Sequence, residues 1–271
     1  MCRHLAYLGP QQPLGRILVE PPHSLYRQSW EPRRQRYGTV NADGFGVGWY
    51  APDDPAPARY RRAGPIWADL SFADLARVVR AGAVLAAVRD ATLAGADAEA
   101  AAAPFAAGRW LFSHNGAIAG WPDSAAPLVS ELPPVELLSL QARTDSAFVW
   151  ALVLHRLRTG DDPAEALGDT VRRFAAAAPA SRLNLLLTDG ETIAATAWGD
   201  SLWYRTEPGL GTVVASEPYD DDPLWQEVPD RTVLTASRAG VLLAPLEDPA
   251  SSPALSSVRA GEPPSPKEPC R

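Results

Sequence analysis

The order of strand-like and helix-like stretches limits the fold of this sequence more than any other feature. Short stretches typical of β-strands come first, helical patterns dominate between residues 134 and 178, and strand-like stretches return after residue 181. The connections are short, and strands do not alternate with helices as they do in a parallel βαβ fold. The order therefore predicts one domain of packed antiparallel sheets with helices on the outside.

Local patterns give the expected bounds of these elements. Gly9 and Pro10 are expected to end the first strand, and the chain from there to about Pro32 is expected to be irregular. Ser71 is expected to cap the first helix, and residues 94–108 are expected to form a mobile loop. Strands are expected at residues 2–8, 45–50, 59–63, 84–88, 110–113, 182–188, 192–198, 203–205, 212–215, 232–236 and 241–243, and helices at 71–80, 134–141, 144–158 and 163–178.

The expected domain spans residues 1–247. Beyond it, residues 248–271 are rich in Pro, Ser, Ala and Gly and show no apolar period, which predicts a disordered tail. Cys270 lies in this tail and is expected to be inert.

Composition and charge argue against several classes of function. Apolar residues make up 46% of the 271 residues, which is ordinary for a globular protein with a sizeable core. The net charge is −7 and no basic run could follow a phosphate backbone, so nucleic acid is not an expected partner. The sequence shows no membrane-spanning apolar stretch and no signal peptide, which predicts a cytoplasmic protein. Its two cysteines lack a C-x-x-C pair or a histidine at ligand spacing, so we expect no disulfide framework, metal or cofactor.

Cys2 is the first candidate catalytic residue. Removal of Met1 would leave a cysteine that carries both a thiol and a free α-amine. An α-amine titrates at a pKa of about 7.7–8.0, so part of it is uncharged at neutral pH and can accept the thiol proton. One residue could then act as nucleophile and base. A cysteine at position 2 is usually not catalytic, so the argument depends on residues elsewhere.

Three further polar segments lie where catalytic and binding residues commonly occur. Residues 89–92, Arg-Asp-Ala-Thr, follow a continuously apolar strand that should be buried on both faces. Residues 114–116, His-Asn-Gly, are expected to form a tight polar turn after another strand, and residues 144–146, Thr-Asp-Ser, begin the longest helical pattern. Each also has an ordinary interpretation, respectively a surface ion pair, a turn asparagine and a helix cap.

Together with Cys2, these segments resemble the class II glutamine amidotransferases of the N-terminal-nucleophile hydrolase superfamily over roughly residues 2–245. The resemblance implies an α+β fold, a four-layer αββα sandwich of two packed antiparallel sheets. Residues 1–5, 24–32 and 41–50 look most like the stand-alone amidohydrolases of ergothioneine biosynthesis. Those enzymes remove glutamate from γ-glutamyl-hercynylcysteine S-oxide, so the resemblance implies this activity through a thioester on Cys2.

The resemblance also implies a role for each matching residue. Cys2 would attack the γ-carbonyl, and the Asn115 amide and Gly116 backbone N–H would hold the oxyanion. The remaining three residues would bind the free glutamyl end of a small-molecule substrate: its α-carboxylate would be held by Arg89 with Thr92, and its α-ammonium by Asp145.

The sequence departs from synthase-fused members of the family at two positions. Asp90 stands where they often carry an aromatic residue, and Ala147 stands where an acidic residue is common. Both could reshape the pocket for a leaving group larger than ammonia. A trimethylammonium and imidazole group would suit an aromatic wall, for which Trp30, Tyr37 and Trp49 are candidates, although core packing explains tryptophans equally well.

Two alternative functions stay open from the sequence. Arg89, Thr92 and Asp145 would contact only the glutamyl half of the substrate. The substrate could therefore also be glutamine or another γ-glutamyl compound such as glutathione or its degradation products. A protein of another class, a catalytically silent γ-glutamyl-binding protein, would be favoured if Met1 were retained. The oligomeric state is not predicted.

Overall fold

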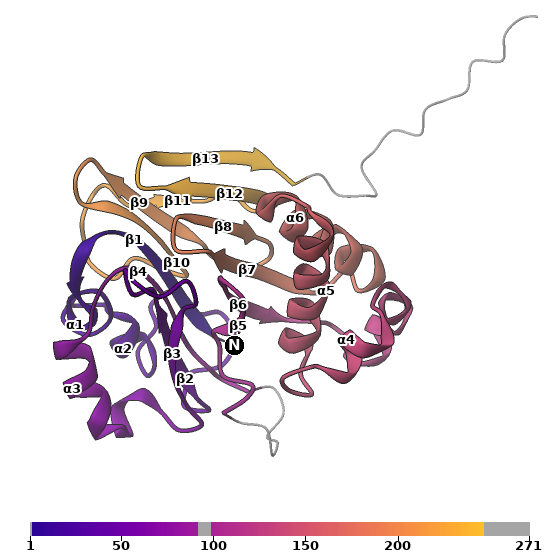
Figure 1. Ribbon diagram of the computed structural model, residues 1–271, viewed down its shortest axis with the longest axis horizontal. Coiled ribbons are helices and arrows are strands. Elements are labelled where there is room, and N and C mark those ends of the chain that lie inside the picture. The colour runs from indigo at the N-terminus through magenta and orange to yellow at the C-terminus, as the bar shows by residue number, and fades with distance from the viewer. Residues whose placement is uncertain (1, 92–98, 247–271) are drawn as a thin grey trace, which may run out of the picture.

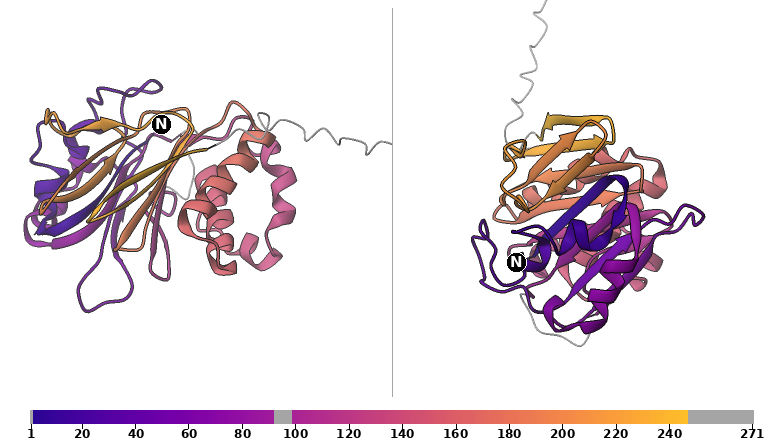
Figure 2. Two further views of the ribbon diagram at one scale, coloured as in Figure 1. Left: turned by 90° about the horizontal axis from the view of Figure 1, so that it is seen from above. Right: turned by 90° about the vertical axis from the view of Figure 1, so that its left-hand side faces the viewer.

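Two antiparallel sheets pack face to face and carry helices on both outer faces (Figure 1). This computed structural model describes residues 2–91 and 99–246. The left view of Figure 2 shows the sheets edge-on between the two helical layers. The predicted α+β, four-layer αββα sandwich is therefore confirmed. Met1, Thr92 and the predicted tail at 248–271 lie outside the described residues.

The strands fall mostly where the sequence predicts them. One sheet contains β1 (Arg3–Pro13), β2 (Phe45–Trp49), β3 (Ala58–Arg62), β4 (Arg80–Val88), β9 (Trp203–Glu207), β10 (Gly211–Ala215) and β11 (Gln226–Glu227), in the order β11-β9-β10-β1-β4-β2-β3. The other contains β5 (Phe105–Ala107), β6 (Trp110–Ala117), β7 (Arg182–Thr188), β8 (Thr192–Ala197), β12 (Thr232–Ser237) and β13 (Gly240–Pro245), in the order β13-β12-β8-β7-β6-β5.

The helices divide between the two outer faces. The face of the seven-stranded sheet carries α1 (Leu14–Leu18), α2 (Leu25–Gln28) and α3 (Leu70–Val78), with a short 3₁₀ helix at Ile66–Ala68. The six-stranded sheet is covered by α5 (Asp145–Thr159) and α6 (Pro163–Ala177), next to α4 (Pro134–Leu138) and the 3₁₀ helix Asp123–Glu131.

The core explains why β1 has a fixed position. Its side chains alternate, so that Leu5 and Tyr7 pack beneath α1 to α3 while Ala6 and Leu8 pack between the two sheets. β1 also has a neighbour on each edge, β4 on one side and β10 on the other. A strand enclosed in this way holds the residue just before it in a defined place.

Two predictions about the first thirty residues are wrong. β1 does not end at Gly9, because an irregularity in its pairing between Leu8 and Gln12 carries the strand on to Pro13. The segment predicted to be irregular contains the short helices α1 and α2. The Ser24 side chain caps α2, accepting from the Arg27 backbone N–H at 3.3 Å.

Three further local predictions need correction. Residues 114–116 do not form a turn but continue β6, paired with β7. The predicted mobile loop at 94–108 contains β5 and the buried residue Ala102, while 92–98 lie outside the described part of the chain. The cap of α3 is Asp69, not Ser71, since the Asp69 carboxylate accepts the first backbone N–H groups of the helix.

Candidate active site

β1 places Cys2 opposite the residue that follows β4. The two strands are antiparallel, and Arg3 lies opposite Val88. Cys2 and Arg89 are the next residues outward on the paired strands, so the register sets them side by side. Cys2 is a half-buried, free cysteine.

Several charged and polar groups act on the Cys2 thiol. Burial raises the pKa of the Cys2 thiol above its ordinary value, and the Asp145 carboxylate adds to that rise. The backbone N–H of Asp90, hydrogen-bonded to the sulfur, and the Arg89 guanidinium act in the opposite direction. The thiol is therefore protonated at neutral pH and needs a base to become a nucleophile.

A turn at Asp43 and Gly44 fixes the segment that carries Arg89. The Arg89 backbone N–H donates to the Gly44 carbonyl at 2.8 Å, and the Asp43 N–H donates to the Arg89 carbonyl at 2.9 Å. The Asp43 carboxylate also accepts the Ala91 N–H at 2.8 Å. Sequence reasoning missed this positioning role, although an Asp-Gly pair before a strand is a usable indication of such a turn.

Asn115 lies in β6, in the opposite sheet, and is fully buried beside β1. Its Nδ2 donates to Ser216 Oγ over 3.4 Å, and the same oxygen accepts the backbone N–H of His4 at 3.0 Å. Ser216 therefore ties the Asn115 amide to a residue two positions after Cys2. Within the described residues the second hydrogen of Nδ2 has no protein acceptor, as an oxyanion donor requires.

Gly116 follows in β6 and lies against β7 at very short range. A Cβ atom at this position would lie 1.9 Å from the Arg182 carbonyl oxygen, so only glycine fits. The neighbouring His114 donates from Nε2 to that same oxygen at 3.0 Å, because a carbonyl can only accept, and its Nδ1 accepts from Ser146 Oγ at 3.0 Å. Sequence reasoning gave His114 no role; it joins β6 to the start of α5.

Asp145 begins α5, but the cap of the helix is Thr144. Thr144 Oγ1 accepts the Ala147 N–H at 3.3 Å. The Asp145 carboxylate instead accepts the N–H groups of Ser146 at 2.7 Å and Ile118 at 3.1 Å, which fixes the carboxylate at the start of α5.

The structure describes five of the six predicted site residues, all but Thr92. It brings together Cys2, Arg89 and Asp145, ties Asn115 to Ser216, and places Gly116 against the Arg182 carbonyl of β7. The chemical roles of these residues remain predictions. Residues 2–91 and 99–246 contain no group of three or more His, Cys, Asp or Glu that could hold a metal ion. Nor does this part of the chain contain a helix long and apolar enough to cross a membrane.

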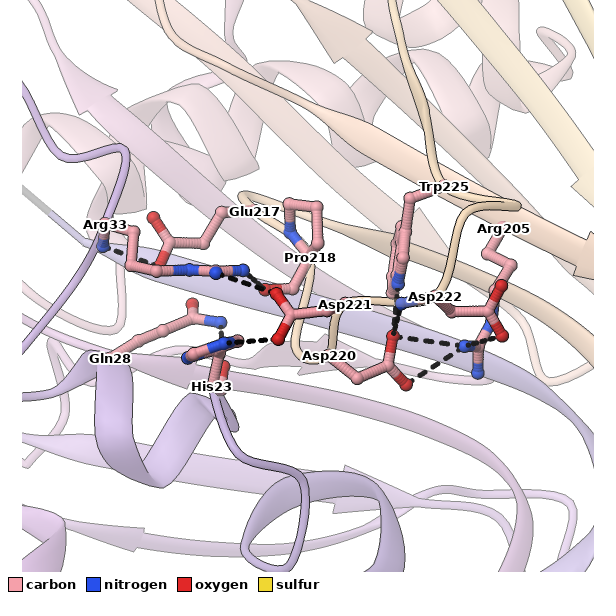
Figure 3. Close-up of polar contacts among 10 residues, drawn as sticks. All are labelled: His23, Gln28, Arg33, Arg205, Glu217, Pro218, Asp220, Asp221, Asp222 and Trp225. Atoms are coloured by element: carbon pink, nitrogen blue, oxygen red, sulfur yellow. Dashed lines mark hydrogen bonds and ion pairs between the residues drawn. The ribbon is translucent and has the colours of Figure 1, made fainter.

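A buried carboxylate anchors the loop of residues 33–41. Glu217, two residues beyond β10, is fully buried, and its oxygens accept the backbone N–H groups of Arg33 at 2.9 Å and Arg34 at 2.6 Å. Figure 3 shows the neighbouring Asp221, which pairs with Arg33 at 3.0 Å and with His23 at 3.2 Å. Sequence reasoning missed Glu217, although a charged residue just after a buried strand is the same indication that singled out residues 89–92.

The anchored 33–41 loop lies directly on the residue next to Arg89. Gly38 has a φ of 70°, and a Cβ atom there would lie 2.0 Å from Asp90 Oδ2. The loop therefore contacts the residue whose backbone N–H hydrogen-bonds the Cys2 sulfur.

The three aromatic residues considered for the leaving-group pocket lie in different surroundings. Tyr37, in the 33–41 loop, has its ring centroid 4.0 Å from Cζ of Arg182. Trp30 packs edge-to-face against Trp67, with centroids 5.8 Å apart, and Trp49 packs against the core beneath the seven-stranded sheet. Of the three, Tyr37 is the residue beside the site.

His4, next to the site, gives the fold a sensitivity to acid. The ring is fully buried, with Nδ1 3.2 Å from Ser113 Oγ and, among the described residues, no partner for Nε2. Burial, helped by the charges of Arg3 and His114, lowers the pKa of His4 to about 3.

We expect the free energy of unfolding to fall as the pH drops from about 6.5 toward about 3. An unfolded histidine binds a proton near pH 6.5, whereas folded His4 does so only near pH 3, so the unfolded state binds more protons across this window. The contribution of His4 should approach about 1.4 kcal/mol per pH unit. Urea unfolding at several pH values measures the slope, and His4→Asn should flatten it. An unchanged slope in that variant would contradict the assignment.

The sequence is similar to known proteins over most of its length. The family profile described as glutamine amidotransferases class-II matches residues 23–208. A protein of Mycolicibacterium smegmatis named gamma-glutamyl-hercynylcysteine sulfoxide hydrolase is 40% identical over 246 residues, which cover 91% of this chain and 100% of the relative. A Mycobacterium tuberculosis protein of the same name is 40% identical over 248 residues, covering 91% and 97%.

Solved structures include one with the same architecture over the whole domain. A glutamine aminotransferase class-II domain protein of Silicibacter pomeroyi superposes with a TM-score of 0.66 at 26% identity, covering 91% of this chain and 100% of that chain.

Proposed function

The chain belongs to the class II glutamine amidotransferases, and on that premise we propose that it hydrolyses the γ-glutamyl amide bond of γ-glutamyl-hercynylcysteine S-oxide. The products would be glutamate and hercynylcysteine S-oxide. The observation that carries the proposal is the 40% identity, across 91% of the chain, to two proteins named for this activity. The substrate is a small polar molecule, and we propose that the protein meets it in the cytoplasm.

The first half of the reaction would acylate Cys2 once Met1 is removed. As the sulfur attacks the γ-carbonyl carbon, the thiol proton moves to the α-amine and the carbonyl oxygen becomes an oxyanion. The Asn115 amide and the Gly116 backbone N–H would hold this charge. Collapse then breaks the C–N bond, the α-ammonium returns the proton to the departing nitrogen, and a γ-glutamyl thioester remains.

Water would complete the cycle. The α-amine of Cys2 takes a proton from the water that attacks the thioester carbon, and the same donors hold the second oxyanion. Breaking the C–S bond releases glutamate, and the proton on the amine returns to the sulfur.

The environment of the thiol supports a base within the same residue. Because burial raises the pKa of the Cys2 thiol, a thiolate formed in advance is disfavoured, and the proton has to leave as the sulfur attacks. An α-amine on the same residue is always within reach of that proton.

The charges beside Cys2 support recognition of a free glutamyl end. We propose that Arg89, assisted by Thr92, binds the α-carboxylate and that Asp145 binds the α-ammonium. Both charged groups of the substrate are free only when the glutamyl residue is linked through its γ-carboxyl. An α-linked glutamyl amide lacks the free α-carboxylate and should not be cleaved.

We expect the purified protein to release glutamate from the sulfoxide with a specificity constant roughly 100-fold or more above that for glutamine. The reason is that a large leaving group offers contacts that ammonia lacks. Enzymatic detection of glutamate measures both reactions, and the α-glutamyl isomer of the sulfoxide is the matched control. A preference for glutamine would contradict the proposed substrate but not the proposed thioester mechanism.

A further inference from the structure

Arg182 lies beside the proposed oxyanion donors yet has no part in the chemistry described so far. It is the first residue of β7, and its carbonyl oxygen accepts from His114 Nε2 at 3.0 Å. The backbone of Gly116 packs against that carbonyl so closely that a Cβ atom would come within 1.9 Å of it. The side chain of Arg182 therefore starts next to the place where the amide bond would be broken.

The guanidinium of Arg182 is held on several sides. Its Cζ lies 4.0 Å from the centroid of the Tyr37 ring, and its Nε lies 3.3 Å from Asp200 Oδ2. The side chain is 19% exposed, and that of Asp200 only 2%. Within the described residues neither Nη atom of Arg182 has a protein hydrogen-bond acceptor. The result is a fixed, partly shielded fork with its two terminal nitrogens open, which is the geometry that binds a carboxylate.

Positive charge also gathers around Arg182. The partly buried Arg182 and the buried Arg3 both act on the Asp200 carboxylate, and the buried Glu217 carboxylate acts on Arg3. The exposed Arg36 also acts on Asp200 and adds a positive charge on the solvent side, where water screens it.

Contacts along the 33–41 loop connect this fork to the nucleophile. Tyr37 stacks on Arg182, and the next residue, Gly38, lies against Asp90, whose backbone N–H hydrogen-bonds the Cys2 sulfur. Arg89 belongs to the seven-stranded sheet and Arg182 to the six-stranded sheet. The two guanidinium groups therefore approach the site from different layers and can serve opposite ends of one substrate.

Resting on the proposed function, we propose that Arg182, held by Tyr37 and Asp200, binds the carboxylate on the carbon next to the departing nitrogen. In a γ-glutamyl-cysteine derivative that nitrogen belongs to an α-amino acid, so a carboxylate lies two bonds away from it. In glutamine the nitrogen carries only hydrogen. The substrate class is therefore γ-glutamyl α-amino acids, and Arg182 distinguishes them from simple γ-glutamyl amides.

A matched pair of substrates tests this on the unmodified protein. One is the γ-glutamyl sulfoxide, and the other is the same molecule built on cysteamine in place of cysteine, which lacks only the carboxylate. We expect at least about a 10-fold higher specificity constant for the carboxylated member. Equal turnover of the two would overturn the role of Arg182 and leave the proposed function standing, whereas turnover of neither would remove the proposed function itself.

Two variants test whether the preference for the carboxylated substrate depends on Arg182. Arg182→Met should lower the specificity constant for the carboxylated substrate about 10- to 100-fold, mainly through KM, and should leave the cysteamine substrate within about 3-fold. Arg36→Met is the matched control, because Arg36 is exposed and influences the same Asp200. Equal losses from the two variants, or equal losses on both substrates, would overturn the assignment.

A covalent probe separates this effect from misfolding. A diazoketone analogue of glutamine has no leaving-group carboxylate and should label Cys2 in Arg182→Met at the wild-type rate. Slow labelling would mean that the substitution damages Cys2 or the residues that bind the glutamyl group. It would contradict the proposal that Arg182 contacts only the leaving group. The substrate pair on the wild-type protein then still decides the proposal.

Discussion

Replacing Cys2 with alanine is expected to lower the rate of glutamate release by at least about 10⁴-fold. Alanine offers no sulfur to form the thioester, and the α-amine that remains cannot replace it. The fold should persist, because residue 2 precedes β1 and belongs to none of the three hydrophobic clusters. Steady-state assays of glutamate release, with circular dichroism as the folding check, measure both outcomes.

Cys270→Ala is the matched control for Cys2→Ala, since these are the two cysteines of the sequence. The control variant should retain full activity. Mass spectrometry of a rapidly quenched reaction should show a γ-glutamyl adduct on the N-terminal peptide of the wild-type protein, and none after Cys2→Ala. Retained turnover in Cys2→Ala would rule out the thioester mechanism.

The second large effect is expected at Asn115. Its replacement by alanine should lower kcat by about 10²–10³-fold with little change in KM, because the amide donor is needed only when negative charge develops on the carbonyl oxygen. The buried side chain also contacts Ser216, so thermal unfolding of the variant has to be measured alongside.

Ser216→Ala is the control that distinguishes the loss of the Asn115 hydrogen bond to the oxyanion from the loss of the residue that positions Asn115. It removes the hydroxyl that holds the Asn115 amide over 3.4 Å but leaves the amide itself in place. A smaller loss of kcat is expected, roughly 10-fold. If Asn115→Ala changed KM alone, or left kcat intact, the oxyanion role would have to be abandoned.

Local patterns were sufficient for much of the fold. The helix α5 begins where Thr144 can cap it and α6 begins at Pro163, both as the sequence predicts. The buried strand at the centre of β4 was also recognisable from its unbroken apolar run. In each case the stabilising interactions are local or depend only on burial, so a single sequence records them.

Two of the errors occur where distant partners decide the structure. Residues 114–116 read as a turn because buried strands rarely carry histidine and asparagine, yet His114 bonds Ser146 and the Arg182 carbonyl, and Asn115 bonds Ser216, all on other elements. The same holds for Glu217, whose partners Arg33 and Arg34 lie 184 and 183 residues away in the sequence.

The site follows the same division. The proximity of Cys2, Arg89 and Asp145 could be predicted because each belongs to a segment with a recognisable family resemblance, whereas their chemical roles stay predictions. Arg182 and Asp200 could not, since an arginine and an aspartate in a strand-rich region carry no pattern that separates them from surface residues. Their proposed role depends on the contact between Arg182 and the Tyr37 ring and on the 3.3 Å distance from Arg182 Nε to Asp200 Oδ2. Both contacts exist only in the folded protein.

The central place of β1 has a consequence for how the protein must be made. Its neighbour β10 ends at Ala215, so the sheet around the N-terminus cannot close until that residue has left the ribosome. At about 5–20 residues per second, this gives a methionine-removing enzyme roughly 10–40 s on an open chain end. In the proposed mechanism, removal of Met1 would therefore fall within the period of synthesis, and an affinity tag fused in front of Cys2 would block the α-amine and abolish the proposed activity.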